Sequence, residues 1–159
     1  MVAVASLLVA VASAVYARGS RDAAVRANEI NVRESRRALR LQVFQSMHQF
    51  SDYCCKYWTL YCMGQVKRSR NLSDRIDAFK WEMEQNGHLD MPGVEAKATE
   101  LIKKAWQMQR LIDRIAGSQC EPLDRAYKTA QENVEALVDW FSKENRELKT
   151  LFQPYLSAA

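Results

Sequence analysis

The feature that most constrains this chain is an abrupt change from apolar to charged residues near its amino terminus. Residues 2–17 carry no charged side chain, and seven arginines follow between residues 18 and 40. As a helix, the apolar run would be about 24 Å long, against a hydrocarbon core of roughly 30 Å. The run is short for a span, but it is apolar on all sides. We therefore predict a transmembrane anchor at residues 1–18.

Two other interpretations of the apolar run stay open. The triplet Ala12-Ser13-Ala14 has the A-x-A form of a signal-peptide cleavage site. Cleavage near Ala14 would leave a soluble or secreted helical binding module, although no lysine or arginine precedes the run as signal peptides require. A buried core helix is the other alternative, but a chain of 159 residues is too small to surround it.

If the run spans a membrane, the arginines set its orientation. They lie only on its carboxyl side, so the positive-inside rule places the amino terminus outside and the helical domain in the cytoplasm, at the cell inner membrane. Arg18 and Arg21 are close enough to attract lipid headgroups. Ser6, Ala10 and Ala14 recur every four residues, a spacing that lets membrane helices pack closely. We expect this face to contact a second copy or another membrane protein; a generic alanine-rich anchor is the alternative.

Residues 19–40 are predicted to form an arginine-rich helical stalk. No proline or glycine interrupts residues 20–61, so we expect one long helix there. Val25, Val32 and Leu39 recur every seven residues, a thin seam that suits a two-stranded coiled-coil contact or a solvated stalk. The outer arginines stand beyond the reach of the lipid surface, because charges in salt solution are screened over about 8 Å. We expect them to face water or an acidic partner; these partner-binding candidates are Arg33, Arg36, Arg37 and Arg40.

Residues 41–159 are predicted to form a bundle of about four helices, so the expected fold class is all-α. Apolar residues recur there at helical spacing, and glycine or proline residues separate the helices. Gly64 is expected to end the first helix, and Pro92 and Pro122 to begin the third and fourth. The fourth is expected to end near Phe152, because Pro154 follows. The predicted core faces are Val43, Met47, Phe50, Cys54, Tyr57 and Tyr61, widened by Leu41, Phe44, Trp58 and Cys62; Leu72, Ile76, Phe79 and Met83; Val94, Ala98, Leu101, Ala105, Met108, Ile112 and Ile115; and Leu123, Tyr127, Ala130, Val134, Leu137, Phe141 and Leu148.

The side-chain chemistry does not indicate catalysis or cofactor binding. The net charge of +4 lies mainly in the arginine-rich segment, so a nucleic-acid surface is not indicated. His48, Cys55 and Cys62 are seven residues apart, and this spacing means about 10.5 Å of helical rise between neighbours, too far for one metal ion. We predict free structural thiols, no metal, no cofactor and no small-molecule substrate. A membrane-bound enzyme of unknown class is the third alternative for the function.

Aromatic residues gather beyond the stalk. Tyr53, Tyr57, Trp58 and Tyr61 cover more than half of the helix circumference. Either one side of this group is core and the other partly exposed, or Tyr53 and Trp58 belong to a partner-binding surface, because aromatic residues anchor interfaces.

The arrangement of the first third of the chain carries a weak resemblance. Residues 2–17, then Arg18, then an alanine- and arginine-rich segment with Ala27-Asn28-Glu29-Ile30, resemble small uncharacterised bacterial single-pass proteins. Those have an amino-terminal anchor, a short stalk and a helical domain, and the resemblance implies no catalytic residue. We expect a non-enzymatic, membrane-anchored interaction or scaffold protein, an oligomer or an accessory subunit of a membrane complex.

Overall fold

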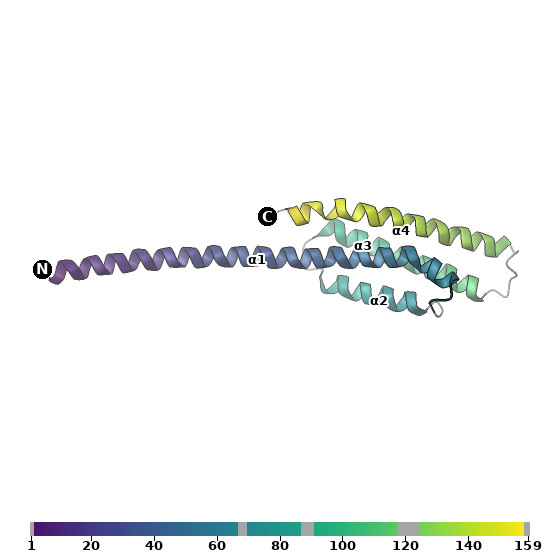
Figure 1. The fold of residues 1–159 in the computed structure, drawn as a ribbon, viewed down its shortest axis with the longest axis horizontal. Helices are drawn as coiled ribbons and strands as arrows, with labels where there is room; N and C mark the ends of the chain where they lie inside the picture. The colour runs from purple at the N-terminus through teal and green to yellow at the C-terminus, as the bar shows by residue number, and fades with distance from the viewer. Residues whose placement is uncertain (1, 67–69, 87–90, 118–124, 158–159) are drawn as a thin grey trace. The chain divides into compact units, whose positions relative to one another are not determined.

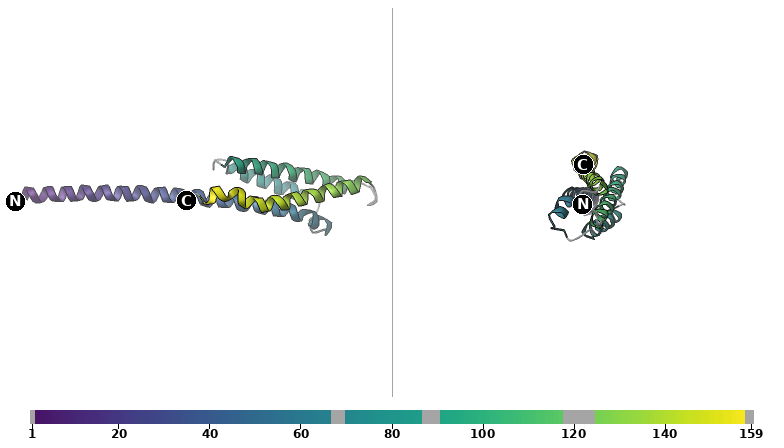
Figure 2. Two further views of the ribbon diagram at one scale, coloured as in Figure 1. Left: turned by 90° about the horizontal axis from the view of Figure 1, so that it is seen from above. Right: turned by 90° about the vertical axis from the view of Figure 1, so that its right-hand side faces the viewer.

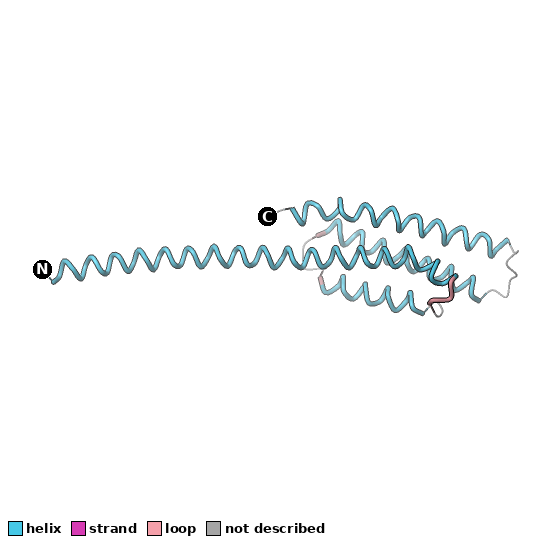
Figure 3. The backbone as a smooth tube through the Cα atoms, in the orientation of Figure 1, coloured by secondary structure: helices cyan, strands magenta, loops and turns pink. Residues whose placement is uncertain are grey.

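The computed structural model describes residues 2–66, 70–86, 91–117 and 125–157. Four α-helices make up nearly all of these ranges (Figure 1): α1 (Val2–Cys62), α2 (Arg70–Gln85), α3 (Pro92–Gly117) and α4 (Arg125–Ser157). Within them there is no strand, and the few described loop residues stand out from the helices in Figure 3. The prediction of an all-α fold with four helices is therefore confirmed.

The chain divides into two compact units, Met1–Ala38 and Leu39–Ala159. The described residues of the first unit all belong to one helix, the amino-terminal part of α1. Every side chain from residue 15 to residue 38 is exposed. A single helix has no second element in its unit against which to bury apolar surface.

The predicted membrane anchor concerns the first eighteen residues. In the part of the chain that the structure describes, no helix has an 18-residue stretch apolar enough to cross a membrane. The side chains of residues 2–12 and 14 lie outside that description, and the predicted packing face of Ser6, Ala10 and Ala14 lies there with them. The structure therefore lends the transmembrane span no support, and the span stays a prediction.

In the second unit, residues 39–62 of α1 and the helices α2, α3 and α4 lie side by side (Figure 2). Together they surround one apolar core. Phe50 of α1 stacks on Phe79 of α2, with ring centroids 4.1 Å apart. The buried hydroxyl of Ser51 donates a hydrogen bond of 3.1 Å to the carbonyl oxygen of Phe141 on α4. This bond gives the buried hydroxyl of Ser51 a partner, so its burial costs little.

The predicted core faces are confirmed at most positions. Two predicted members are exposed instead, Leu41 at 43% and Cys62 at the end of α1, and Leu123 lies outside the described residues. Six others are partly buried and pack against the edge of the core: Phe44, Trp58, Tyr61, Met83, Tyr127 and Ala130. The remaining predicted positions are buried: Val43, Met47, Phe50, Cys54 and Tyr57 of α1; Leu72, Ile76 and Phe79 of α2; Val94, Ala98, Leu101, Ala105, Met108, Ile112 and Ile115 of α3; and Val134, Leu137, Phe141 and Leu148 of α4.

Glycine and proline fix two of the helix boundaries as predicted. Gly64 has φ of 68°, a left-handed conformation that side chains with a Cβ rarely adopt. Its amide donates to the carbonyl of Tyr61 at 3.0 Å, and the amide of Gln65 donates to that of Leu60 at 3.0 Å, which closes the end of α1. At the other boundary, α3 begins at Pro92, where a missing amide hydrogen costs nothing.

The predicted end of the fourth helix is wrong. We expected it near Phe152, but α4 continues through Pro154 to Ser157. Proline removes one backbone donor, yet its fixed φ near −65° suits a helix. Tyr155 and Leu156 pack against the core beyond it, and this packing favours continuing the helix. The predicted start at Pro122 lies outside the described residues.

Candidate interaction surfaces

Most of the arginines predicted to bind lipid or a partner are exposed on α1. The exposed ones are Arg18, Arg21, Arg33, Arg36 and Arg37. None of these five arginines has an ion-pair partner among the described residues, so their charges are available to an anionic surface.

Arg40 differs from the other arginines because its side chain belongs to the bundle. It is half-buried, and its Nη1 donates a hydrogen bond of 3.3 Å to the carbonyl oxygen of Tyr155. The guanidinium carbon also lies 6.0 Å from the centroid of the Tyr155 ring. Arg40 therefore helps to fasten the last turn of α4 to α1, and it offers less free charge than its neighbours.

Tyr53 and Trp58 are half-buried and lie against the core rather than standing free. The Tyr53 ring lies under the Arg75 guanidinium of α2, at 5.8 Å from its centroid, and burial raises the pKa of its hydroxyl. Trp58 stacks on Tyr61, with centroids 5.8 Å apart and ring planes at 16°. Both side chains thus have internal packing roles, with part of each left accessible.

The seam predicted on the stalk is open to solvent. Val25 is 51% exposed and Val32 is 44% exposed, although both are apolar and β-branched. Leu39, at the start of the second unit, keeps the seven-residue spacing and is 36% exposed. The residue before each of these three is small or short: Ala24, Asn31 and Ala38. Small side chains beside an apolar seam allow another helix to approach closely.

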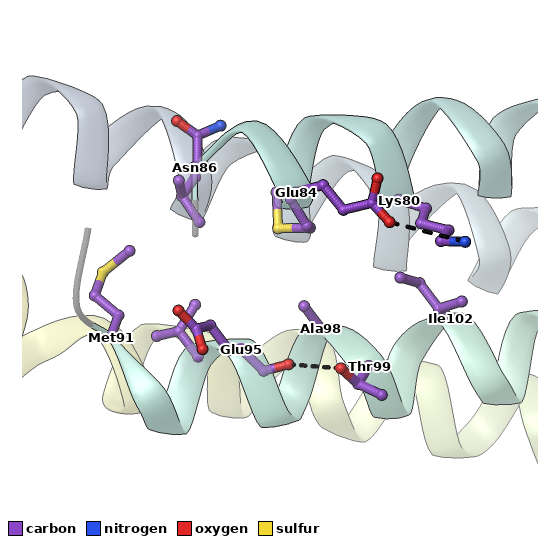
Figure 4. Close-up of a pocket in the computed structure, with 11 residues that line it drawn as sticks. Lys80, Glu84, Asn86, Met91, Glu95, Ala98, Thr99 and Ile102 are labelled. Atoms are coloured by element: carbon purple, nitrogen blue, oxygen red, sulfur yellow. Dashed lines mark hydrogen bonds and ion pairs between the residues drawn. The ribbon is translucent and has the colours of Figure 1, made fainter. Parts of the chain in front are cut away.

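A cavity of about 430 Å³ lies between α2 and α3 (Figure 4). Its inner lining is formed by Val43 of α1 and by Met91, Val94 and Ala98, each less than 5% exposed. Figure 4 shows the short side chain of Ala98 pointing into the space between the two helices, where a larger side chain would fill it. The volume falls within the range of ligand pockets, and the floor is apolar.

The mouth of this cavity is polar: Asn86 and Thr99 form hydrogen bonds there, and Lys80 forms an ion pair with Glu84. Lys80 Nζ lies 3.8 Å from a carboxylate oxygen of Glu84. Asn86 donates to a backbone carbonyl of α2 at 2.8 Å, and the hydroxyl of Thr99 donates to the backbone carbonyl of Glu95 at 3.0 Å. Within the described ranges, the carboxylate of Glu95 makes neither an ion pair nor a hydrogen bond. The mouth therefore presents an exposed negative charge, without an ion-pair partner among the described residues, beside an apolar space.

A charged cluster joins α3 to α4. Lys97 Nζ lies 2.7 Å from Glu100 Oε2 and 2.9 Å from Glu144 Oε2. Burial works to lower the pKa of Lys97, but hydrogen bonds to Glu100 and Glu144 outweigh it, so the pKa is raised. The ring of Trp140 lies beside two lysines, with Nζ of Lys97 at 6.0 Å and Nζ of Lys104 at 5.6 Å from its centroid. Every charge here has a partner, which marks the cluster as structural.

The three thiols that the structure describes show no arrangement suited to catalysis. Cys54 is buried, Cys55 is half-buried and accepts a hydrogen bond of 3.5 Å from Ser142, and Cys62 is exposed; all three are free. Burial raises the pKa of each thiol, and a raised pKa makes a thiol a poorer nucleophile at neutral pH. In the described part of the chain, no three His, Cys, Asp or Glu side chains are placed to hold a metal ion. Cys120 lies outside it.

Comparison with known protein families, with curated proteins and with solved structures finds no match to this chain. The resemblance to small bacterial single-pass proteins therefore stays a prediction.

Two features of the second unit were missed in the sequence. Glu144 falls on the apolar stripe of α4, between Phe141 and Leu148, and a carboxylate in such a stripe is a detectable signal of a buried ion pair. The cavity between α2 and α3 has no comparable signal, since it depends on the separation of two helices rather than on their residue pattern.

Proposed function

We propose that this chain is a non-enzymatic, membrane-anchored interaction protein that associates with a second copy of itself through the seam on α1. The observation that carries this proposal is the exposure of Val25 and Val32. Both lie on the part of α1 that forms the first unit, where the structure describes no second helix to cover them. Apolar residues at heptad spacing lose contact with water when a like helix covers them.

A shared anchor favours a parallel contact. If both copies enter the membrane through residues 1–18, their stalks begin at the same height and run in the same direction. Each seam residue then meets its own equivalent, Val25 opposite Val25 and Val32 opposite Val32, which is the self-complementary arrangement of a symmetric dimer. In this arrangement the amino terminus lies outside and the bundle in the cytoplasm, as the positive-inside rule predicts.

The residues beside the seam are compatible with this pairing. In a parallel two-stranded contact, the residue before a seam position faces the fifth residue further along the other helix. Ala24 would face Glu29, and Asn31 would face Arg36. Neither pair brings like charges together, so no electrostatic repulsion opposes the contact.

Two or three heptads form a weak contact in water, because short helices are only marginally stable. An anchor raises the effective concentration of one stalk around another and strengthens such a contact without any new interaction. Anchor and seam therefore support each other in this proposal. In this register Asn28 and Ser35 take the second inward position of each heptad. These polar residues limit the strength of the contact further, which suits reversible association.

The test compares a seam substitution with a matched one on another face. Val32→Asp places a charge in the seam. Ile30→Asp places the same charge away from the seam, at a side chain of similar exposure: Ile30 is 58% exposed and Val32 is 44% exposed. Both variants are reconstituted in lipid bilayers, and dimer fractions are measured by fluorescence energy transfer between labelled copies. Loss of transfer in Val32→Asp alone supports the proposal; equal behaviour of the two variants overturns it.

A second candidate function rests on Ala12-Ser13-Ala14, the form of a cleavage site. Cleavage near Ala14 would release a soluble or secreted helical module without an anchor. The mass of the mature amino terminus, measured on protein purified from its own host, distinguishes the two: an intact Met1 or Val2 supports the anchored protein, and a chain that begins near Val15 supports the released module.

A further inference from the structure

We propose that the cavity between α2 and α3 binds a small amphiphile, with an apolar chain inside and a cationic head at Glu95. This site lies wholly within the second unit, so the inference does not depend on pairing of the stalks.

The chemistry of the floor selects the apolar part of the ligand. Val43, Met91, Val94 and Ala98 offer no hydrogen-bonding side chain, and all four are less than 5% exposed. A polar group placed among them would lose its bonds to water without replacement, which costs free energy. The buried part of the occupant is therefore a hydrocarbon chain.

Two methionines allow this space to adapt to its occupant. Met83 belongs to α2 and Met91 precedes α3, and both line the cavity. Methionine has a flexible, polarisable side chain that fills irregular gaps, and it is common at binding surfaces that adjust their shape. The cavity can thus close around a chain narrower or wider than its resting form.

The chemistry of the mouth selects the head. The amide of Asn86 and the hydroxyl of Thr99 donate to backbone carbonyls. Lys80 and Glu84 form an exposed ion pair of 3.8 Å, and their opposite charges offset each other. The carboxylate of Glu95 remains, without an ion-pair or hydrogen-bond partner among the described residues. A positively charged donor such as an ammonium group fits this position, whereas an anionic head would meet repulsion.

The experiment uses three probes that share one chain and differ in their heads: hexylammonium, hexanol and hexanoate. The full-length protein, reconstituted in lipid nanodiscs, carries ¹³C-labelled methionine methyl groups. The methyl signals of Met83 and Met91 report the cavity, and those of the buried Met47 and Met108 serve as internal controls. Because the signals belong to the protein, uptake of probe by the lipid does not produce them.

We expect saturable shifts at Met83 and Met91 and not at the control methyl groups. Hexylammonium should bind about three-fold more tightly than hexanol, and hexanoate more weakly than both, as for a partly exposed charge pair. Absence of a saturable shift, or equal shifts at all four methionines, overturns the proposal. A response of the same two signals to protein concentration alone assigns the space to a second copy and overturns it as well.

Two variants locate the probe. Glu95→Gln removes the charge at an exposed site, so it should abolish the preference for hexylammonium and leave hexanol binding unchanged. Ala98→Leu fills the space and should abolish the shifts with every probe. If Ala98→Leu fails to fold, Glu95→Gln alone decides: an unchanged order of the three affinities overturns the assignment of the head.

Discussion

Lys97 of α3 and Glu144 of α4 lie 2.9 Å apart, nitrogen to oxygen, and Glu144 is only 7% exposed. A carboxylate in such a position depends on its partner, since burial removes water that would otherwise solvate its charge. We predict that Lys97→Met lowers the free energy of unfolding by about 3 kcal/mol, because it leaves a buried charge uncompensated. Urea denaturation followed by circular dichroism measures this loss.

The matched control for that substitution is Lys143→Met, on the same helix as Glu144. Lys143 pairs with Glu147 at 3.9 Å, and both side chains are more than half exposed. Exposed pairs of this kind contribute roughly 0–1 kcal/mol. Equal losses of stability in the two variants would show that the buried position of Glu144 has no special consequence.

Gly64→Ala should destabilise the protein, because residue 64 has φ of 68° and an added Cβ is strained there. The expected cost is about 1 kcal/mol. Gly117→Ala is the control: its Cβ would meet no atom within 4 Å and its backbone is not left-handed, so helix propensity predicts no loss or a small gain. Thermal unfolding of both variants checks this, and a higher melting temperature for Gly64→Ala would contradict the assignment of the helix end.

The protein should lose stability at alkaline pH, and Cys54 should be one cause. Burial raises the pKa of this thiol above its ordinary value of 9.0. Above that pH the unfolded chain releases the proton while the folded chain retains it, so rising pH favours unfolding by up to about 1.4 kcal/mol per pH unit. Burial also raises the pKa of Tyr57, from 10.0 to about 12, so this hydroxyl adds to the loss of stability above pH 10.

Cys54→Ala tests the role of this thiol. Denaturation in reducing buffer between pH 8 and pH 11 should show a shallower loss of stability for the variant than for the natural chain. Cys62→Ala, at an exposed position, should change the slope less. If Cys54→Ala leaves the pH dependence unaltered, the thiol does not keep its proton in the folded protein at these pH values.

The anchor should be necessary for association of the stalks. A chain beginning at Gly19 keeps the seam and the bundle, but it loses the effective concentration that a membrane provides. We expect it to remain in the soluble fraction and to sediment as a monomer at micromolar concentration, whereas the full chain sediments with membranes. A stable dimer of the shortened chain would show that the seam suffices without the anchor.

Much of the bundle could be predicted because its helices follow one simple rule. Apolar residues at helical spacing are buried along α3 from Val94 to Ile115, and the signals at Gly64 and Pro92 fall at real helix boundaries. Pro154 shows where local rules fail: the packing of Tyr155 and Leu156 on the core outweighs one lost hydrogen bond. Local propensity competes with tertiary contacts, and at Pro154 the tertiary contacts decide the outcome.

The candidate sites were harder to predict from the sequence, because they depend on contacts between residues that are far apart along the chain. Arg40 resembles the other stalk arginines in sequence, yet it binds a carbonyl of Tyr155, 115 residues further along the chain. Glu95 resembles any surface glutamate until the cavity beside it is known. Spacing along one helix predicts which residues share a face, but it does not predict what lies opposite that face.

The central claim, that two copies meet through the α1 seam, is tested most directly by disulfide cross-linking at Val32. In a chain whose natural cysteines are replaced by alanine, Val32→Cys is oxidised in native membranes and the covalent dimer is measured by gel electrophoresis. In the proposed dimer, the two copies of residue 32 lie close enough for a disulfide, which needs Cα atoms about 4.4–6.8 Å apart. The control, Ile30→Cys, places its two thiols on the faces of the helices that point away from each other. We predict a covalent dimer for Val32→Cys and little or none for Ile30→Cys; equal yields from both, or no dimer from Val32→Cys, would contradict the account.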